Sequence, residues 1–295
     1  MNWSIFFIAF LGVIIWLNPY VKCMFMHPLK TIKYGIIDTY KFIRYKQWRL
    51  YKDYGLLDIY SGIFGQGKTL SSTIIVRDIY KRYNNKKVYD FKDRKWKTQK
   101  IELMTNVTLN DIKALPLLCM DDILKWCNHP KDDNSINILV VLIDETSTQL
   151  NSRAFKTNFT TDLLNILLTC RHHKIRIIGT TPRFNQVDAL VRQVTNHDIE
   201  CSKWWRLVKH SHYNAWQLEN TNDVSSIEPL YTRCIFVDDS DFNAYDTFAC
   251  VQNFIDNVKK GLHLTDAEIL AYREFNSNDD NFIHLKKKYR KMIKK

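Results

Sequence analysis

Short apolar runs alternate along the chain with longer stretches in which apolar and polar residues are mixed. Three of these runs are predicted to be strands, at Leu56–Ser61, Ile138–Ile143 and Ile175–Gly179. The last two are almost wholly apolar, which is typical of parallel strands buried on both faces of a sheet. Helical stretches are predicted from Lys68 to about Tyr83 and over about Thr161–His173. The pattern therefore predicts an α/β fold with a mostly parallel central sheet covered by helices.

The pattern changes after Asn196, where aromatic residues become frequent. Two runs are predicted to pair as a hairpin and a third to form another strand: Ile199–Val208, Tyr213–Leu218 and Leu230–Val237. Ile101–Val107 is predicted to be a strand of the main sheet, and residues 84–100 and 128–137 to be surface connections. The adjacent Trp204 and Trp205 either stack on nucleic-acid bases or serve as packing anchors.

The N-terminus has no charged side chain from Met1 to Val21, and Trp3–Leu17 is almost wholly apolar. A membrane-spanning helix needs about 20 residues, which this segment reaches when its uncharged flanks are included. Positive charge begins at Lys22, which places the following chain on the cytoplasmic side. We therefore predict a transmembrane anchor over residues 1–24, and a single-pass protein of a host or bacterial inner membrane whose remaining chain is cytoplasmic. A buried core helix is the alternative.

The net charge of +12 is concentrated in two flanks. Residues 22–52 hold eight Lys or Arg against one Asp, and residues 286–295 hold seven and no acid. Basic flanks suit acidic lipid or nucleic acid, although in the tail they also suit simple solvation. Residues 25–54, aromatic and basic, are predicted to lie as an amphipathic juxtamembrane segment on anionic headgroups, or else to pack on the core. Residues 251–295 are predicted to be a helical segment with a basic tail.

The cysteines give no sign of a disulfide framework. The seven of them are an odd number without any C-x-x-C pair, which favours a reducing compartment. The Cys170–His173 cluster lacks the ligand spacing of a metal site.

Residues 62–69 match the pattern G-x-x-x-x-G-K-[ST] between a predicted strand and a predicted helix. Glycines in such a loop let backbone amides close around the phosphates of a nucleotide, and the start of the helix favours the anion. Lys68 would reach the β- and γ-phosphates, and Thr69 would bind Mg²⁺. The residues predicted to contact ATP are Gly62, Gly65, Gly67, Lys68, Thr69 and Leu70. Residues 55–250 are thus predicted to be a P-loop ATPase domain.

The apolar run Ile138–Ile143 ends in Asp144 and Glu145. In a P-loop enzyme an Asp at this place holds Mg²⁺, and the adjacent Glu can activate water. A polar tip on the neighbouring strand, Thr180 or Thr181, would sense the γ-phosphate, or would simply cap the strand. The predicted catalytic set is therefore Lys68, Glu145 and Thr180, with Mg²⁺ held by Thr69 and Asp144. The Asp-Glu pair favours a hydrolysing ATPase over a kinase or a GTPase, and no guanine-specifying motif is recognisable.

Taken together, the motifs resemble the zonula occludens toxin-like (Zot) proteins, the gene I or assembly ATPases of filamentous phages, within the HerA–FtsK superfamily. The resemblance covers roughly Leu57–Ala249. Besides the P-loop and the Asp-Glu pair, it includes Thr105-Asn106, Arg171-His172-His173, Pro182–Arg192 and Ala244–Thr247. The P-loop and the Asp-Glu pair are widely shared, and three motifs narrow the choice: Arg171-His172-His173, Val187–Arg192 and Tyr245–Thr247.

The resemblance implies a RecA-like core that hydrolyses Mg-ATP in a homo-oligomeric ring and moves single-stranded DNA through the inner membrane with phage or secretion assembly proteins. It also implies that Arg192, or less directly Arg171, acts on a neighbouring subunit's phosphates. Two features depart from the family pattern. The strand tip is Thr180-Thr181-Pro182 where many relatives carry Gln, and the predicted anchor precedes the ATPase domain. An ATP-binding scaffold without motor activity is the alternative function.

Overall fold

The computed structural model describes residues 3, 7, 10, 12, 18–118, 121–146, 161–221 and 226–246. The chain divides into two compact units, Met1–Leu50 with Lys87–Trp96, and Tyr51–Lys86 with Lys97–Lys295. The predicted C-terminal segment with its basic tail, residues 251–295, lies outside the described residues.

The first unit begins with two helices, α2 (Pro19–Met26) and α3 (Pro28–Arg44), followed by the 3-10 helix η1 (Gln47–Arg49). The Asn18 side chain accepts hydrogen bonds from the backbone N–H groups of Tyr20 and Val21 and so caps α2. Each α-helix starts with a proline, which lacks the N–H that a first helical position leaves unpaired. The predicted helix after residue 28 is present, but it ends at Arg44, and Lys46 then turns the chain with a φ of 48°.

No helix among the described residues is both long enough and apolar enough to cross a bilayer. Most of the Trp3–Leu17 segment, on which the predicted anchor depends, lies outside those residues.

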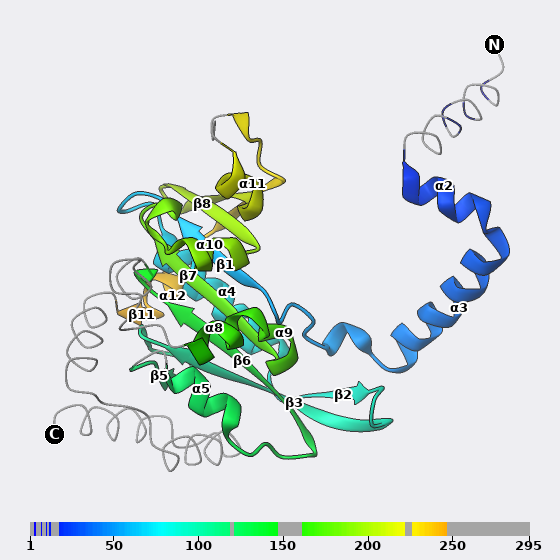
Figure 1. The fold of residues 1–295 in the computed structure, drawn as a ribbon, viewed down its shortest axis with the longest axis horizontal. Helices are drawn as coiled ribbons and strands as arrows, with labels where there is room; N and C mark the ends of the chain where they lie inside the picture. Colours follow the sequence, from blue (N-terminus) through cyan, green and yellow to red (C-terminus); the bar gives the residue numbers. More distant parts are fainter. Residues whose placement is uncertain are drawn as a thin grey trace. The chain divides into compact units, whose positions relative to one another are not determined.

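The second unit is built on a mixed, mostly parallel sheet in the order β10-β9-β8-β1-β7-β6-β3, with β5 beside β3 (Figure 1). Strands β8, β1, β7, β6 and β3 run parallel to one another, whereas β9 is antiparallel to both β8 and β10. The strands are β1 (Leu57–Ser61), β3 (Lys95–Thr105), β5 (Leu115–Pro116), β6 (Ser135–Ile143), β7 (Ile175–Thr181), β8 (His197–Trp204), β9 (Leu207–Asn214) and β10 (Tyr231–Phe236). The predicted α/β fold with a mostly parallel sheet is confirmed.

Crossover direction places helices on both faces of this sheet. The steps from β3 to β6, β6 to β7 and β7 to β8 run one way along the sheet, and the step from β1 towards β3 runs the other way. Because such crossovers are right-handed, the two directions put their helices on opposite faces. One face carries α5 (Asp121–Asn128), α8 (Thr161–Leu168), α9 (Cys170–His173) and α10 (Ala189–Val194), and the other carries α4 (Lys68–Tyr83) (Figure 1).

The larger core cluster fills the space between the sheet and the α5–α10 face. Alternate residues of β1, β6 and β7 point to this face, because side chains alternate along a strand. They pack against buried side chains of the covering helices. The cluster includes Leu57, Ile59, Leu139, Val141, Ile143, Ile175, Ile177, Trp126, Ile166, Leu167 and Val191.

Two predicted boundaries were wrong. Residues 84–100 were predicted to be a surface connection, but β2 (Lys86–Asp90) and the start of β3 form a hairpin there. Charged residues recur in β2 and in the first part of β3, which hid the strand pattern, and only Val88 of β2 is fully buried. The β8–β9 hairpin turns at Trp205 and Arg206, earlier than predicted, and Trp205 has the left-handed φ of 54° that closes the turn. The predicted second strand, Tyr213–Leu218, is therefore wrong from residue 215 on, where the helix α11 (Ala215–Asn220) begins.

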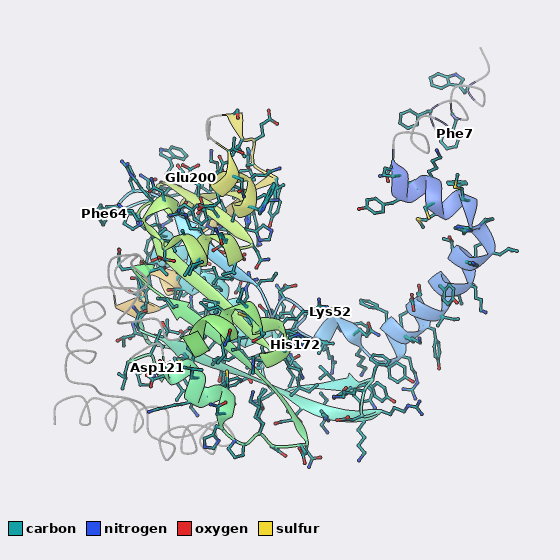
Figure 2. The ribbon with its side chains drawn as sticks, viewed as in Figure 1. Phe7, Lys52, Phe64, Asp121, His172 and Glu200 are labelled. Carbon is teal, nitrogen blue, oxygen red and sulfur yellow. The ribbon has the colours of Figure 1, made fainter. Side chains whose placement is uncertain are left out.

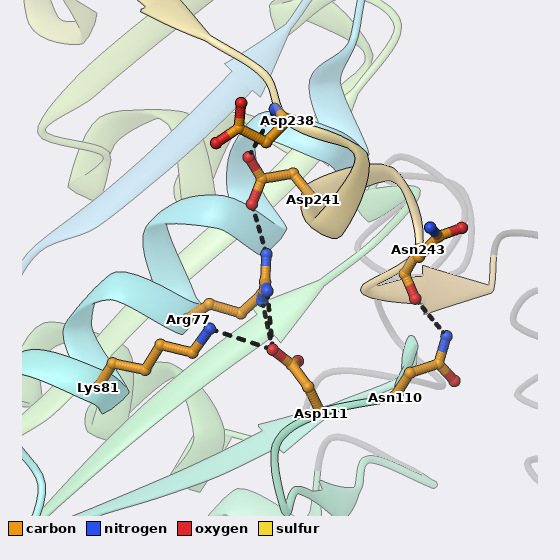
Figure 3. Close-up of polar contacts among 7 residues, drawn as sticks. All are labelled: Arg77, Lys81, Asn110, Asp111, Asp238, Asp241 and Asn243. Carbon is orange, nitrogen blue, oxygen red and sulfur yellow. Dashed lines mark hydrogen bonds and ion pairs between the residues drawn. The ribbon is translucent and has the colours of Figure 1, made fainter.

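Helix α4 is fastened to the C-terminal part of the domain through the buried Arg77 (Figure 3). The guanidinium donates to Asp111 Oδ2 from Nε at 3.0 Å and from Nη2 at 2.7 Å, and to Asp241 Oδ1 from Nη1 at 2.5 Å. Asp241 belongs to the short helix α12 (Asp239–Phe242). Beside it, β11 (Tyr245–Asp246) pairs with β4 (Thr108–Leu109) in a separate two-stranded sheet.

Candidate nucleotide-binding site

The loop between β1 and α4 has the backbone that its glycines predict. Gly62, Gly65 and Gly67 have φ values of 144°, 79° and 81°, a region that favours glycine. At Gly62 space is limiting as well, because an added Cβ would lie 2.9 Å from the carbonyl oxygen of Cys201. The loop therefore cannot keep this course with larger residues. Phe64, 79% exposed, projects from it (Figure 2).

The start of α4 fits an anion. Gly67 is the N-cap residue and offers no side-chain cap, so the first amide groups of the helix, from Lys68 to Leu70, have no capping side chain. Such a helix end binds phosphate well. Lys68 Nζ donates to the carbonyl oxygen of Ile63 at 3.2 Å and lies 5.3 Å from the centre of the Phe64 ring. The ammonium group is thus held on the loop itself, as the predicted phosphate contact requires.

Residues of strands β8 and β9 contact the phosphate loop and the first turn of α4. The amide of Lys203 donates to Gln66 Oε1 at 2.9 Å. Ser71 Oγ donates to the carbonyl of Gly67 at 2.7 Å and lies 2.7 Å from Nε2 of the buried His210. The buried His210 ring thus lies within hydrogen-bond distance of the side chain that contacts the last glycine of the phosphate loop.

The pH dependence of stability should report this histidine. Burial, helped by the charges of His212 and Arg233, lowers the pKa of His210 to about 4 from its ordinary value near 6.5. Below pH 6.5 the unfolded chain therefore binds more protons at this residue than the folded chain does. The stability that the neutral His210 contributes is complete above pH 6.5 and is lost as the pH falls towards 4. Relative to a His210→Gln variant, the wild type should lose about 3 kcal/mol of unfolding free energy over that range in urea titrations.

Asp198 serves as a control of opposite sign. Burial raises the pKa of this carboxyl to about 7. Relative to Asp198→Asn, the wild type should therefore lose stability as the pH rises from about 4 to about 7. If the difference in unfolding free energy between the wild type and His210→Gln does not change with pH, His210 is not a buried neutral group.

Three elements converge at the carboxyl edge of the sheet, where parallel α/β folds bind their ligands. Asp144 follows β6, Thr180 lies near the end of β7, and Thr69 is in the first turn of α4. Asp144 Oδ1 accepts from Thr69 Oγ1 at 2.8 Å and from Thr180 Oγ1 at 2.5 Å. The structure thus brings together the two predicted Mg²⁺ ligands and the predicted strand-tip residue. A hydroxyl and a carboxylate are the oxygen ligands that Mg²⁺ prefers, so Thr69 and Asp144 fit the ion. Bound there, it would neutralise charge on the phosphates.

Asn106 holds Asp144 in place, a role that its sequence motif did not reveal. It follows β3, and its amide oxygen accepts from the backbone N–H of Asp144 at 2.8 Å. Its amide nitrogen donates to the Asp144 carbonyl at 3.0 Å. This two-point contact between neighbouring strand ends fixes the carboxylate where Thr69 reaches it.

Glu145 has a backbone conformation that is rare for its residue type. Its φ is 54°, and its N–H donates to Thr180 Oγ1 at 3.0 Å. Such strained positions are enriched at functional sites. Burial raises the pKa of its carboxyl, the charge of Asp144 raises it further, and Lys68 opposes both. A carboxylate with a raised pKa is a better proton acceptor near neutral pH, as the predicted activation of water requires.

Thr146 packs closely against Thr180 and Gly179 near the end of β7. The Thr146 hydroxyl donates to the Thr180 carbonyl at 2.6 Å. A Cβ on Gly179 would lie 2.6 Å from Thr146 Oγ1 and 2.9 Å from Ile59 Cδ1. Only glycine leaves room for this contact, and nothing in the sequence singled it out.

Replacing Thr180 by valine tests its place in this network. Valine keeps the shape but removes the bonds to Asp144 and to the Glu145 amide, so we expect ATP turnover to fall about 10- to 100-fold, equivalent to about 1–3 kcal/mol. Thr181→Val is the matched control, because the Thr181 hydroxyl is also buried but donates to the carbonyl of Arg183 instead. The melting temperatures of the two variants are compared first, to show that both are folded. Equal ATP turnover in two equally stable variants would then contradict the role given to Thr180.

Arg192 is not brought to the phosphate loop. Its guanidinium binds Glu219 of α11 (Ala215–Asn220), at 2.5 Å from Nε and 3.0 Å from Nη2. Nη1 also donates to the carbonyls of Asn185 and Val187. Action on a neighbouring subunit stays a prediction, and it would require these bonds to break.

A comparison with known families fits this geometry. The family model described as "Zonular occludens toxin (Zot)" matches residues 59–229, more than half of the chain. The chain belongs to the Zot family. The matched residues include the loop glycines, Asp144, Glu145 and Thr180, whereas the Ala244–Thr247 motif lies beyond them. The resemblance inferred from the motifs is confirmed, and the Zot match falls on the P-loop fold described above.

Solved structures include a second member of the Zot family. The N-terminal domain of zonular occludens toxin from Neisseria meningitidis is 15% identical, with a TM-score of 0.41, over 65% of this chain and 98% of that one. The genome packaging NTPase B204 from Sulfolobus turreted icosahedral virus 2, in complex with ATP-gammaS, is 12% identical, with a TM-score of 0.31, over 51% and 77%. No curated protein sequence matches the chain.

Proposed function

We propose that this Zot-family chain is a membrane-anchored ATPase that uses Mg-ATP hydrolysis to drive export, assembly or packaging of viral or mobile-element DNA at a bacterial inner membrane. The observation that carries the proposal is the meeting of Thr69, Asp144 and Glu145 at the phosphate loop. Lys68 and the first amides of α4 would stabilise the charge on the phosphates, and Glu145 would take a proton from the attacking water.

The proposed contact with single-stranded DNA is the tip of the β8–β9 hairpin. Trp204 and Trp205 are 75% and 67% exposed, and Trp205 also meets the Phe236 ring edge-on with the ring centres 6.0 Å apart. Lys203 and Arg206 flank them, and the amide of Lys203 contacts the phosphate loop through Gln66. Exposed aromatic rings beside basic groups suit sequence-independent stacking on bases. A contact at this tip would couple DNA binding to the nucleotide site.

The remaining parts of the proposal extend the family resemblance. Residues 1–24 would anchor the chain with the ATPase domain in the cytoplasm. A homo-oligomeric ring would place Arg192 near a neighbour's nucleotide, and phage or secretion assembly proteins would dock on it. The anchor, the ring and the docking partners can each be tested separately from ATP hydrolysis.

Single-stranded DNA should stimulate ATP hydrolysis, and the double variant Trp204→Ala/Trp205→Ala should lose the stimulation while keeping basal turnover. Stacking contributes about 1–3 kcal/mol per base, so DNA affinity should fall at least about tenfold in the variant. Trp216→Ala is the control, because Trp216 is equally exposed on α11. If DNA leaves the hydrolysis rate of the wild type unchanged, the motor is ruled out in favour of an ATP-binding scaffold.

A further inference from the structure

Four aromatic rings join the end of α3 to the turn between β2 and β3. Tyr45, just after α3, stacks on Tyr89 with the ring centres 4.2 Å apart and the planes 26° apart. Phe91 meets the Tyr45 ring edge-on at 5.2 Å, and Trp96 meets the Tyr89 ring at 5.5 Å. Residues 87–96, called the hairpin tip below, therefore form one compact unit with the N-terminal helices.

This unit is one of the two strongly basic parts of the protein, and the tail at residues 286–295 is the other. Residues 1–50 and 87–96 contain eleven Lys or Arg and three Asp, a net charge of +8 out of +12 for the whole chain. Lys92, Arg94 and Lys95 of the hairpin tip are all exposed. A concentration of positive charge on one small unit calls for an anionic partner rather than solvation alone.

The same unit exposes large apolar side chains. Helix α3 buries none of its residues. Five of its apolar residues recur at spacings of three and four and so form one stripe along the helix: Leu29, Ile32, Ile36, Tyr40 and Ile43. In the hairpin tip, Phe91 and Trp96 are 46% and 47% exposed, and Trp48 of η1 is 50% exposed. Aromatic and apolar side chains next to Lys and Arg are the composition of a membrane–water interface.

We propose that the hairpin tip and α3 form one surface that lies on an anionic lipid bilayer, with Phe91 and Trp96 at headgroup depth and Lys92, Arg94 and Lys95 against the lipid phosphates. This inference rests on the membrane attachment in the proposed function. A bilayer is favoured over nucleic acid because the apolar stripe of α3 needs an apolar phase, which nucleic acid does not offer. In the sequence, the apolar run Trp3–Leu17 also comes directly before the helices of this unit. The hairpin tip thus adds a second contact to the predicted juxtamembrane helix.

The test follows backbone hydrogen exchange in the full chain, purified in detergent and reconstituted into lipid nanodiscs. One set of discs contains phosphatidylcholine alone, and the other contains phosphatidylcholine with phosphatidylglycerol. We expect residues 87–96 and 28–44 to exchange on the order of tenfold more slowly in the anionic discs. Lys92→Glu/Lys95→Glu should lose this difference at the hairpin tip. Lys209→Glu/Arg233→Glu, which changes the net charge equally at exposed positions of β9 and β10, should keep it.

The possible outcomes distinguish a failed lipid contact at the hairpin tip from a failed membrane attachment of the whole chain. If the chain stays in the discs but residues 87–96 exchange equally in both kinds, the inference fails and membrane attachment stands. If the chain enters neither kind of disc, both fail. If single-stranded DNA slows exchange of the hairpin tip in detergent while anionic lipid does not, the surface binds nucleic acid and the inference is overturned.

Discussion

Glu145→Gln should bind ATP as tightly as the wild type and hydrolyse it about 10²–10⁴ times more slowly, the range expected when a general base is removed. The amide keeps the size of the side chain and the N–H···Thr180 bond, but it cannot accept the proton of the attacking water. ATP affinity, measured by equilibrium binding, should hold because Lys68 and the loop amides are unchanged. Single-turnover hydrolysis then reports the chemical step alone.

The pH profile gives this prediction a second readout. Because burial and Asp144 raise the pKa of Glu145, protonation should lower turnover as the pH falls through that raised value. The Glu145→Gln variant should lack this acid limb. Glu200→Gln is the control, since Glu200 is exposed on β8 and its carboxylate accepts a hydrogen bond from the Tyr213 hydroxyl at 3.4 Å. Hydrolysis retained by Glu145→Gln would assign the base to another group.

The sequence predicted those parts of the site whose residues lie close together along the chain. The phosphate loop was predictable because its glycines, Lys68 and Thr69 lie within eight residues. Asp144 was predictable because a buried strand ends directly before it. In contrast, the contact of Asn106 with Asp144 joins residues 38 positions apart on neighbouring strands. Only the strand order brings them together, and a single sequence does not state that order.

The same reasoning explains the errors in the fold. The β2–β3 hairpin was missed because its strands carry Lys and Asp where a buried sheet would carry apolar residues. The β8–β9 turn was misplaced because Trp205 takes a left-handed φ that favours glycine or asparagine. Arg77 gave no signal at all, since one Arg in a helix is usually a solvated charge.

Arg77→Met should lower the free energy of unfolding by about 3 kcal/mol, the low end of the range for breaking a buried ion pair. Methionine keeps the apolar part of the side chain but leaves Asp111 and Asp241 without the guanidinium that both accept from (Figure 3). The low end applies because Lys81 still lies 3.2 Å from Asp111, which is partly exposed. Arg82→Met, on the exposed side of the same helix, should change stability by less than about 0.5 kcal/mol.

A double variant and an acid titration decide whether the ion pair, rather than packing, carries this effect. Arg77→Met/Asp111→Asn should be more stable than Arg77→Met alone, because it also removes the Asp111 carboxylate that has lost the guanidinium. Burial raises the pKa of Asp111, but its bonds to Arg77 and Lys81 outweigh this and hold it below its ordinary value. The pair therefore stabilises the wild type above about pH 4, and this stability is lost as the pH falls through the depressed pKa. Arg77→Met should show a shallower acid loss in urea titrations. If it instead matches Arg82→Met in stability and in acid sensitivity, α4 is held to the C-terminal part of the domain by apolar packing alone.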